Sequence, residues 1–122
     1  MKQIIFTEKA PAAIGPYSQA VLTNGTLYVS GQIALAKVEE GANIEEETHQ
    51  IMANMKAILE AANMTFENVV KCTIFVKDMN NFVAINGVYG EYFPLNPPAR
   101  ETVEVARLPK DVNVEISCVA VQ

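Results

Sequence analysis

The chain contains no tryptophan, a single histidine and only two cysteines among its 122 residues. So few nitrogen and sulfur ligands cannot build an ordinary transition-metal site, and they leave no Ser-His-Asp or Cys-His arrangement for nucleophilic catalysis. The sequence also lacks a Walker-type phosphate loop and a GxGxxG motif after a strand. We therefore expect no metal site, and any chemistry must come from other polar side chains.

Basic residues are scarce as well. Nine Lys and Arg stand against 14 Asp and Glu, which gives a net charge of −5 and an isoelectric point near 4.8. Proteins that bind nucleic acids need a basic stripe to neutralise phosphates, so we expect no nucleic-acid partner. No apolar run approaches the ~18–20 residues that span a membrane. The first residues also lack the apolar segment of a secretory signal, so we expect a cytoplasmic protein that does not contact a membrane.

The two cysteines, Cys72 and Cys118, lie within strand-like apolar runs. A free cysteine in such a run behaves as a small hydrophobic residue. In a cytoplasmic protein we expect two reduced thiols rather than a disulfide.

Length and composition limit the architecture. The chain has room for one hydrophobic core, and no linker or charge block divides it, so we expect one domain over residues 1–122. Half of the residues are hydrophobic and 19% are charged, which is apolar for a protein with so much surface. Burial of part of that surface in an oligomer is the simplest explanation.

Hydrophobic periodicity predicts six strands and two helices. The strands are expected over residues 3–6, 18–22, 26–33, 68–77, 100–107 and 112–121, and the helices over 44–62 and after Asp78 to about 93. Asn24-Gly25 is typical of a tight hairpin turn. Ser30-Gly31 interrupts a strand and indicates a bulge or a close approach to the backbone. A polar loop is expected around Gly41.

This order predicts an α+β sandwich in which two helices cover one face of a mixed sheet. The last strand is largely apolar on both sides, so we expect the other face to be covered by a second subunit. Gly87 and Gly90 weaken the second helix but would allow close packing.

Three polar residues stand out individually as candidates for function. Arg100 follows a double proline at the start of a strand and could bind a carboxylate, although it could also be a solvated charge. Glu115 lies in an apolar strand and must be either paired or functional. Asn86 is an amide on the apolar stripe that the second helix turns to the core, with Phe82, Ile85, Tyr89 and Phe93. It could be a satisfied core amide or a donor to a site. His49 falls off the apolar stripe, and we expect a surface residue.

The candidate set is Tyr17, Ser30, Gly31, Asn86, Arg100 and Glu115. An arginine, several hydrogen-bonding groups and one acid suit a reaction whose substrate is already electrophilic and needs only positioning and water.

Several segments that carry these residues resemble one family. They are Ala10-Pro-Ala-Ala-Ile-Gly-Pro-Tyr-Ser-Gln19, Ser30-Gly-Gln32, Phe82-Val-Ala-Ile-Asn-Gly-Val-Tyr89, Pro98-Ala-Arg100 and Val103-Glu-Val-Ala-Arg-Leu-Pro-Lys-Asp111. In order and over nearly the whole chain, the sequence is similar to the Rid family of imine deaminases, of the RidA type. The resemblance implies a chorismate-mutase-like α+β fold and a homotrimer whose sheets form a central barrel, with active sites between subunits.

The resemblance also implies roles for the residues. Arg100 would bind the substrate carboxylate with backbone N–H groups near Gly31 and Thr102, and Glu115 would hold the attacking water. Tyr17 would complete the catalytic group, while Ser30 and Asn86 would line the pocket. The implied reaction converts reactive 2-imino acids such as 2-iminobutanoate and 2-iminopropanoate to 2-keto acids and ammonia, without a cofactor, and removes the damaging 2-aminoacrylate.

The sequence departs from the family pattern at four positions. Glu101 stands where a small residue such as Ser is usual, and Thr102 replaces a common cysteine. Ala34 and Ser117 stand where Pro and a second Glu are frequent. Strand alternation should point Glu101 away from Arg100.

A non-catalytic trimer that binds metabolites and regulates or protects partner proteins is the competing hypothesis. A ribonuclease is disfavoured by the acidic charge.

Overall fold

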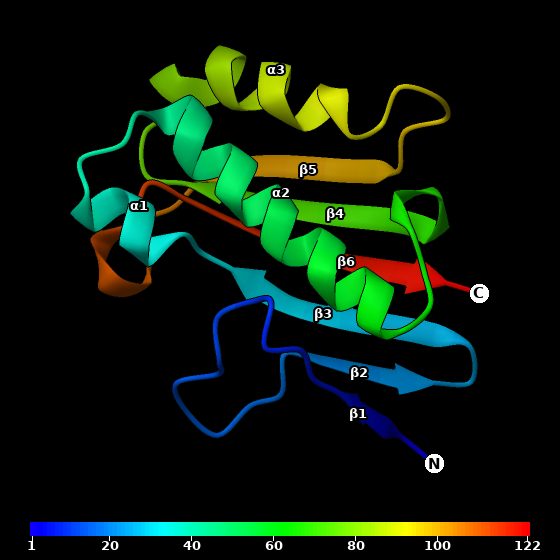
Figure 1. Cartoon of the computed structure of the whole chain (residues 1–122). Helices are drawn as coiled ribbons and strands as arrows, with labels where there is room; N and C mark the ends of the chain where they lie inside the picture. The colour runs from blue at the N-terminus through cyan, green and yellow to red at the C-terminus, as the bar shows by residue number, and fades with distance from the viewer.

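The structure is a computed structural model that describes all 122 residues, and its centre is one six-stranded sheet (Figure 1). The strands are β1 (Gln3–Ile5), β2 (Ala20–Thr23), β3 (Thr26–Gln32), β4 (Val69–Val76), β5 (Ala99–Glu104) and β6 (Val114–Val121). They lie in the order β1-β2-β3-β6-β4-β5. The β4–β5 pair is parallel and the other pairs are antiparallel, so the sheet is mixed.

Two of the three α-helices lie side by side on one face of this sheet (Figure 1). The helices are α1 (Leu35–Glu39), α2 (Ile44–Ala61) and α3 (Phe82–Glu91). Asn43 and Glu46 form a capping box at the start of α2, which satisfies backbone N–H groups that have no partner within the helix. The predicted apolar stripe of this helix is buried except at Ile44, which is partly buried, and Ile51, Met55 and Ile58 are fully buried. The predicted α+β architecture is confirmed.

The hairpin between β2 and β3 also agrees with its prediction. Asn24 and Gly25 have φ angles of 49° and 75°, as a turn that matches the twist of antiparallel strands requires. The register between β3 and β6 shifts between Val29 and Gln32. The bulge predicted at Ser30-Gly31 is therefore present.

The two faces of the sheet differ in cover. Along β6, Val114, Ile116, Cys118 and Ala120 are buried, because they belong to the core that the helices cover. The residues between them, which include Glu115, face the other side and are only partly buried. No helix of this chain packs on that side, which we call the open face (Figure 1). Its large apolar side chains include Ile4 and Tyr28, each about half exposed.

The cysteines lie on the covered face. Cys72 and Cys118 are opposite each other on β4 and β6, and both are buried and free, as predicted. None of the helices is both long enough and apolar enough to cross a lipid bilayer.

Several local predictions were wrong. The polar loop expected around Gly41 contains the short helix α1, and Asp78 caps a 3-10 turn at Met79–Asn81 rather than α3 itself. The close packing that Gly87 and Gly90 would allow does not occur within the chain, since a Cβ at either position would meet nothing within 4 Å. The strand that begins near Arg100 ends at Glu104, not at Arg107.

Candidate functional site

Arg100 lies on the outermost strand of the sheet, β5, and its side chain is held by α3. Arg100 pairs with Cys72 on β4, so its side chain lies on the face of the sheet that the helices cover. The guanidinium Nη1 donates a hydrogen bond of 2.5 Å to Oδ1 of Asn86. The guanidinium carbon also lies 5.0 Å from the centre of the Tyr89 ring and 5.7 Å from that of Phe82, which are distances of cation–π contacts. Three groups therefore fix its orientation.

The same guanidinium has no acidic partner. The four ion pairs of the chain join Lys37 to Glu40, His49 to Glu91, Lys71 to Glu101, and Lys77 to Asp111. An arginine fixed by an amide and two rings, with no carboxylate beside it, keeps its charge available for an anionic ligand. Asn86 itself is exposed on α3, so it is not a core amide, which was one of the two alternatives. It borders the cleft, and its oxygen accepts the hydrogen bond from Arg100.

A cleft of about 450 Å³ opens beside Arg100. Its walls are formed by Asn86, Tyr89, Gly90, Phe93, Pro97 and Pro98. The amide and the guanidinium supply polar lining, while Phe93 and the two prolines supply apolar lining. Such a cleft suits a small molecule that has an acid group and an apolar group.

The two buried side-chain polar atoms without a hydrogen-bond partner both lie on residues next to Arg100. They are Oη of Tyr89, whose ring contacts the guanidinium, and Oγ1 of Thr102, two residues further along the same face of β5. Burial raises the pKa of Tyr89 well above its ordinary value, and the thiol of Cys72 adds to this effect, so the phenol stays neutral. Buried polar groups without a partner are rare in folded proteins, and a catalytic role or a bound water is among their explanations.

Glu115 forms a second centre on the open face of the sheet. Its carboxylate has no hydrogen-bond or ion-pair partner in the chain, and burial raises its pKa above the ordinary value. A Cβ at Gly31 would lie only 2.5 Å from Oε2 of Glu115, so only glycine lets the carboxylate lie against this backbone. The close approach predicted for Gly31 is therefore present, and the approaching group is Glu115 itself.

Tyr17 and Ser30 lie near Gly31, in the loop before β2 and in β3. The hydroxyl of Ser30 donates a 2.6 Å hydrogen bond to the backbone oxygen of Ser18, which ties β3 to the loop before β2. Tyr17 is 50% exposed and, with Gly31, lines a cavity of about 530 Å³ between that loop and α1. Its hydroxyl is accessible to a ligand.

The predicted residues thus form two separate groups in one chain. Arg100, Asn86 and Thr102 lie together, and Tyr17, Ser30, Gly31 and Glu115 lie elsewhere. Cys72 pairs with both Arg100 and Cys118, so these three residues share the covered face, whereas Glu115 belongs to the open face. Strand β4 lies between β5 and β6, so the guanidinium and the carboxylate are kept apart.

Glu101 points away from Arg100, as strand alternation predicts. Its carboxylate accepts a 2.7 Å hydrogen bond from the Thr73 hydroxyl and lies 3.1 Å from Nζ of Lys71. The Thr73 hydrogen bond, together with Lys71, holds the pKa of Glu101 below its ordinary value. The negative charge of Glu101 is therefore paired with Lys71 on the open face.

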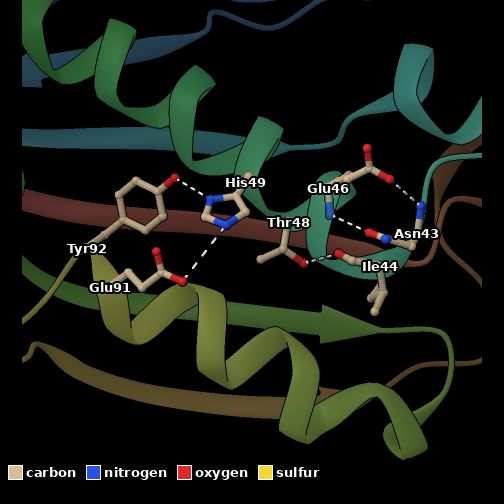
Figure 2. A network of polar contacts seen from close by, with 7 residues as sticks. All are labelled: Asn43, Ile44, Glu46, Thr48, His49, Glu91 and Tyr92. Atoms are coloured by element: carbon tan, nitrogen blue, oxygen red, sulfur yellow. Dashed lines mark hydrogen bonds and ion pairs between the residues drawn. The ribbon is translucent and has the colours of Figure 1, made fainter.

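His49 contacts a different set of residues from those of either group (Figure 2). Its Nδ1 lies 2.7 Å from the hydroxyl of Tyr92, and its Nε2 lies 3.9 Å from a carboxylate oxygen of Glu91. His49 is therefore a partly exposed residue, as predicted, but it has partners on α3 and the following residue that its sequence neighbours did not indicate.

Sequence reasoning missed the roles of Tyr89, Phe82 and Gly90. The two aromatic residues were expected only as members of an apolar stripe, and their spacing from Asn86 by three and four positions was the available signal. Nothing in the sequence indicated that Gly90 borders a cleft.

Comparisons with known proteins agree on one group of relatives. The protein family described as Endoribonuclease L-PSP matches residues 7–122. A RutC family protein of Synechocystis is 52% identical over 124 residues, covering 98% of this chain and 95% of that protein. The human 2-iminobutanoate/2-iminopropanoate deaminase is 46% identical over 126 residues, covering 100% of this chain and 91% of that protein. The crystal structure of E. coli TdcF with bound serine has a TM-score of 0.92 and 40% identity, covering 98% of each chain.

Proposed function

Because the chain belongs to the Rid family, which includes the L-PSP and RutC proteins, we propose that it hydrolyses reactive 2-imino acids. The substrates would be 2-iminobutanoate, 2-iminopropanoate and the enamine 2-aminoacrylate that tautomerises to the latter. In this reaction the C=N bond is replaced by C=O, water supplies the oxygen, and the nitrogen leaves as ammonia.

The observation that best supports this proposal is the position of the Arg100 side chain and its lack of an acidic partner. Its guanidinium is oriented by Asn86 and Tyr89, borders an open cleft, and has no carboxylate partner. A 2-imino acid offers the planar carboxylate that a guanidinium binds through two parallel hydrogen bonds. Binding there would fix the position of the neighbouring imine carbon. Because this carbon is already electrophilic, correct positioning is the main requirement for the attack of water.

Glu115 is the candidate for positioning and deprotonating water. Its unpartnered carboxylate can accept a proton from the water, and its raised pKa makes it a stronger base than an ordinary carboxylate. Addition of water to the imine carbon gives a carbinolamine. Proton transfer to its nitrogen then allows the C–N bond to break, and ammonia and the 2-keto acid are released.

This chemistry needs two copies of the chain, since one copy holds Arg100 and Glu115 apart. We propose a homotrimer in which the open faces pack around a central barrel and the Arg100 cleft of one subunit meets the Tyr17, Ser30 and Glu115 group of the next. The partly exposed Ile4 and Tyr28 on the open face support this arrangement. Closed cyclic assembly is the usual outcome when one surface of a subunit fits a different surface of its neighbour.

Binding without turnover is the second candidate function. Its support is that the Arg100 cleft is complete in one chain, while the proposed base is not beside it. A trimer with this cleft could bind 2-keto or 2-amino acids and regulate or protect partner proteins.

The ribonuclease description of the family has less support in this chain. The net charge is −5, and the lone histidine hydrogen-bonds to Tyr92 instead of lying in either group. RNA binding without a basic surface would be weak.

The test is acceleration of 2-keto acid formation from freshly generated 2-aminoacrylate, measured above the spontaneous rate. We expect activity in the wild type, its loss in Arg100→Ala, and its retention in Arg107→Ala, because Arg107 is an exposed arginine outside the cleft. Absence of acceleration by the wild type would reject the deaminase. If wild type and Arg100→Ala bound 2-keto acids equally well, the carboxylate role of Arg100 would also be rejected.

A further inference from the structure

The cleft beside Arg100 is larger than a 2-imino acid with a methyl or ethyl side chain needs, because pockets of this size accept drug-sized ligands. A carboxylate on the guanidinium would leave the rest of the ligand facing Phe93, Pro97 and Gly90 within a cleft of about 450 Å³. Two of these positions are rigid: Pro97 has a fixed φ, and Phe93 packs against Tyr89 with ring centres 4.8 Å apart. The remaining position, Gly90, has no side chain at all.

Neither backbone conformation nor packing requires glycine at position 90. Its φ is not positive, and a Cβ built there would meet nothing within 4 Å. A glycine inside a helix is less favourable than an alanine there. What glycine does supply is an open wall in the cleft.

Building on the proposed function, we propose that Gly90 is the residue that sets the size of the side chain that the Arg100 cleft accepts. A larger residue at position 90 would take up part of the space beside Phe93 and Pro97 in the lining of the cleft, while Arg100 and Asn86 would keep their contacts. Small 2-imino acids would then still bind and react, and those with bulky apolar side chains would be excluded.

Gly87 supplies a matched control. It is also an exposed glycine of α3 with free space around its Cβ position, but it does not border the cleft. Leucine at either position raises helix propensity without a clash in the chain, so both variants should fold.

The experiment compares wild type, Gly90→Leu and Gly87→Leu on a small and a bulky substrate. The imino acids of 2-aminobutanoate and leucine are generated by an added L-amino acid oxidase, and kcat/KM is measured for each above the spontaneous rate. Removing room for a few methylene groups should lower the bulky-to-small ratio by about tenfold or more in Gly90→Leu. The ratio should stay within about twofold of the wild type in Gly87→Leu, because that position is outside the cleft. An unchanged ratio in Gly90→Leu, or an equal fall in Gly87→Leu, would overturn the proposal.

A binding measurement separates this proposal from the proposed function. Calorimetric titration with 2-oxobutanoate and 4-methyl-2-oxopentanoate gives the same ratio without turnover. If the wild type does not hydrolyse imines but Gly90→Leu shifts the binding ratio, the deaminase fails and the role of Gly90 stands. If neither keto acid binds to the wild type, the role of Gly90 fails as well.

Discussion

Replacing Asn86 by aspartate would test whether the free charge of Arg100 matters. The substitution keeps the size of the side chain and an oxygen that can accept the 2.5 Å hydrogen bond from Nη1. It adds a negative charge beside a guanidinium that has no carboxylate partner in the chain. The new carboxylate would compete with the carboxylate of the ligand for Arg100.

The size of the effect follows from Coulomb's law. Two unit charges about 6 Å apart repel by roughly 0.7 kcal/mol at the dielectric constant of water, and by roughly 3 kcal/mol at an effective value of about 20. Because Asn86 is exposed on α3, the repulsion energy between its new charge and the ligand carboxylate should fall between these limits. A penalty of about 1–2 kcal/mol corresponds to roughly fivefold to thirtyfold weaker binding.

The assay is calorimetric titration of wild type and Asn86→Asp with 2-oxobutanoate at low and high salt. The loss of affinity should shrink as salt is added, because part of it is screened. Asn80→Asp adds the same charge at an exposed asparagine outside the cleft and should leave the affinity within about twofold of the wild type. If Asn86→Asp bound the keto acid as tightly as the wild type did, Arg100 would not be the carboxylate site.

Three further predictions concern the acidic residues of β6 and β5. Because burial raises the pKa of Glu115, kcat/KM of the wild type should rise with pH through a pKa above the ordinary carboxyl range, and Glu115→Gln should lower the rate and remove this step. The raised pKa also means that Glu115 binds its proton more tightly in the folded state than in the unfolded state. The free energy of unfolding should therefore fall as the pH rises from the pKa of Glu115 in the unfolded state to its pKa in the folded state. Denaturant titrations of Glu115→Gln should lack this contribution. Glu101→Ser, which restores the usual residue of the family, should change kcat/KM by less than about threefold, since Glu101 contacts Lys71 and Thr73 on the other face of the strand. A tenfold gain in that variant would mean that its charge does weaken anion binding.

Local sequence signals were sufficient for much of the fold. The hairpin at Asn24-Gly25, the long apolar stripe of α2 and the interruption at Gly31 each depend on neighbouring residues, and the structure has all three. Helix α1 was missed because five residues with good helix propensity are too few to produce a periodic pattern, and Ala34 offers no capping side chain.

The candidate site was only partly accessible from sequence. Arg100 and Asn86 were both singled out, but their contact depends on how α3 lies against β5, which no local pattern determines. Tyr89 was predicted as a core residue, and it is buried, yet it also supports the guanidinium. The separation of Arg100 from Glu115 follows from the strand order, which places β4 between β6 and β5 and is set by long-range pairing.

The central claim is that Arg100 of one subunit works with Glu115 of another, and a mixing experiment tests it most directly. Arg100→Ala and Glu115→Gln would each be assayed alone, and then as mixed oligomers obtained by coexpression with two different tags. In a cyclic trimer that contains both variants, one of the three interfaces has both intact residues, whichever variant is present twice. The purified mixed trimers should therefore recover about a third of the wild-type activity. Mixed oligomers no more active than the two variants alone would contradict a site shared between subunits.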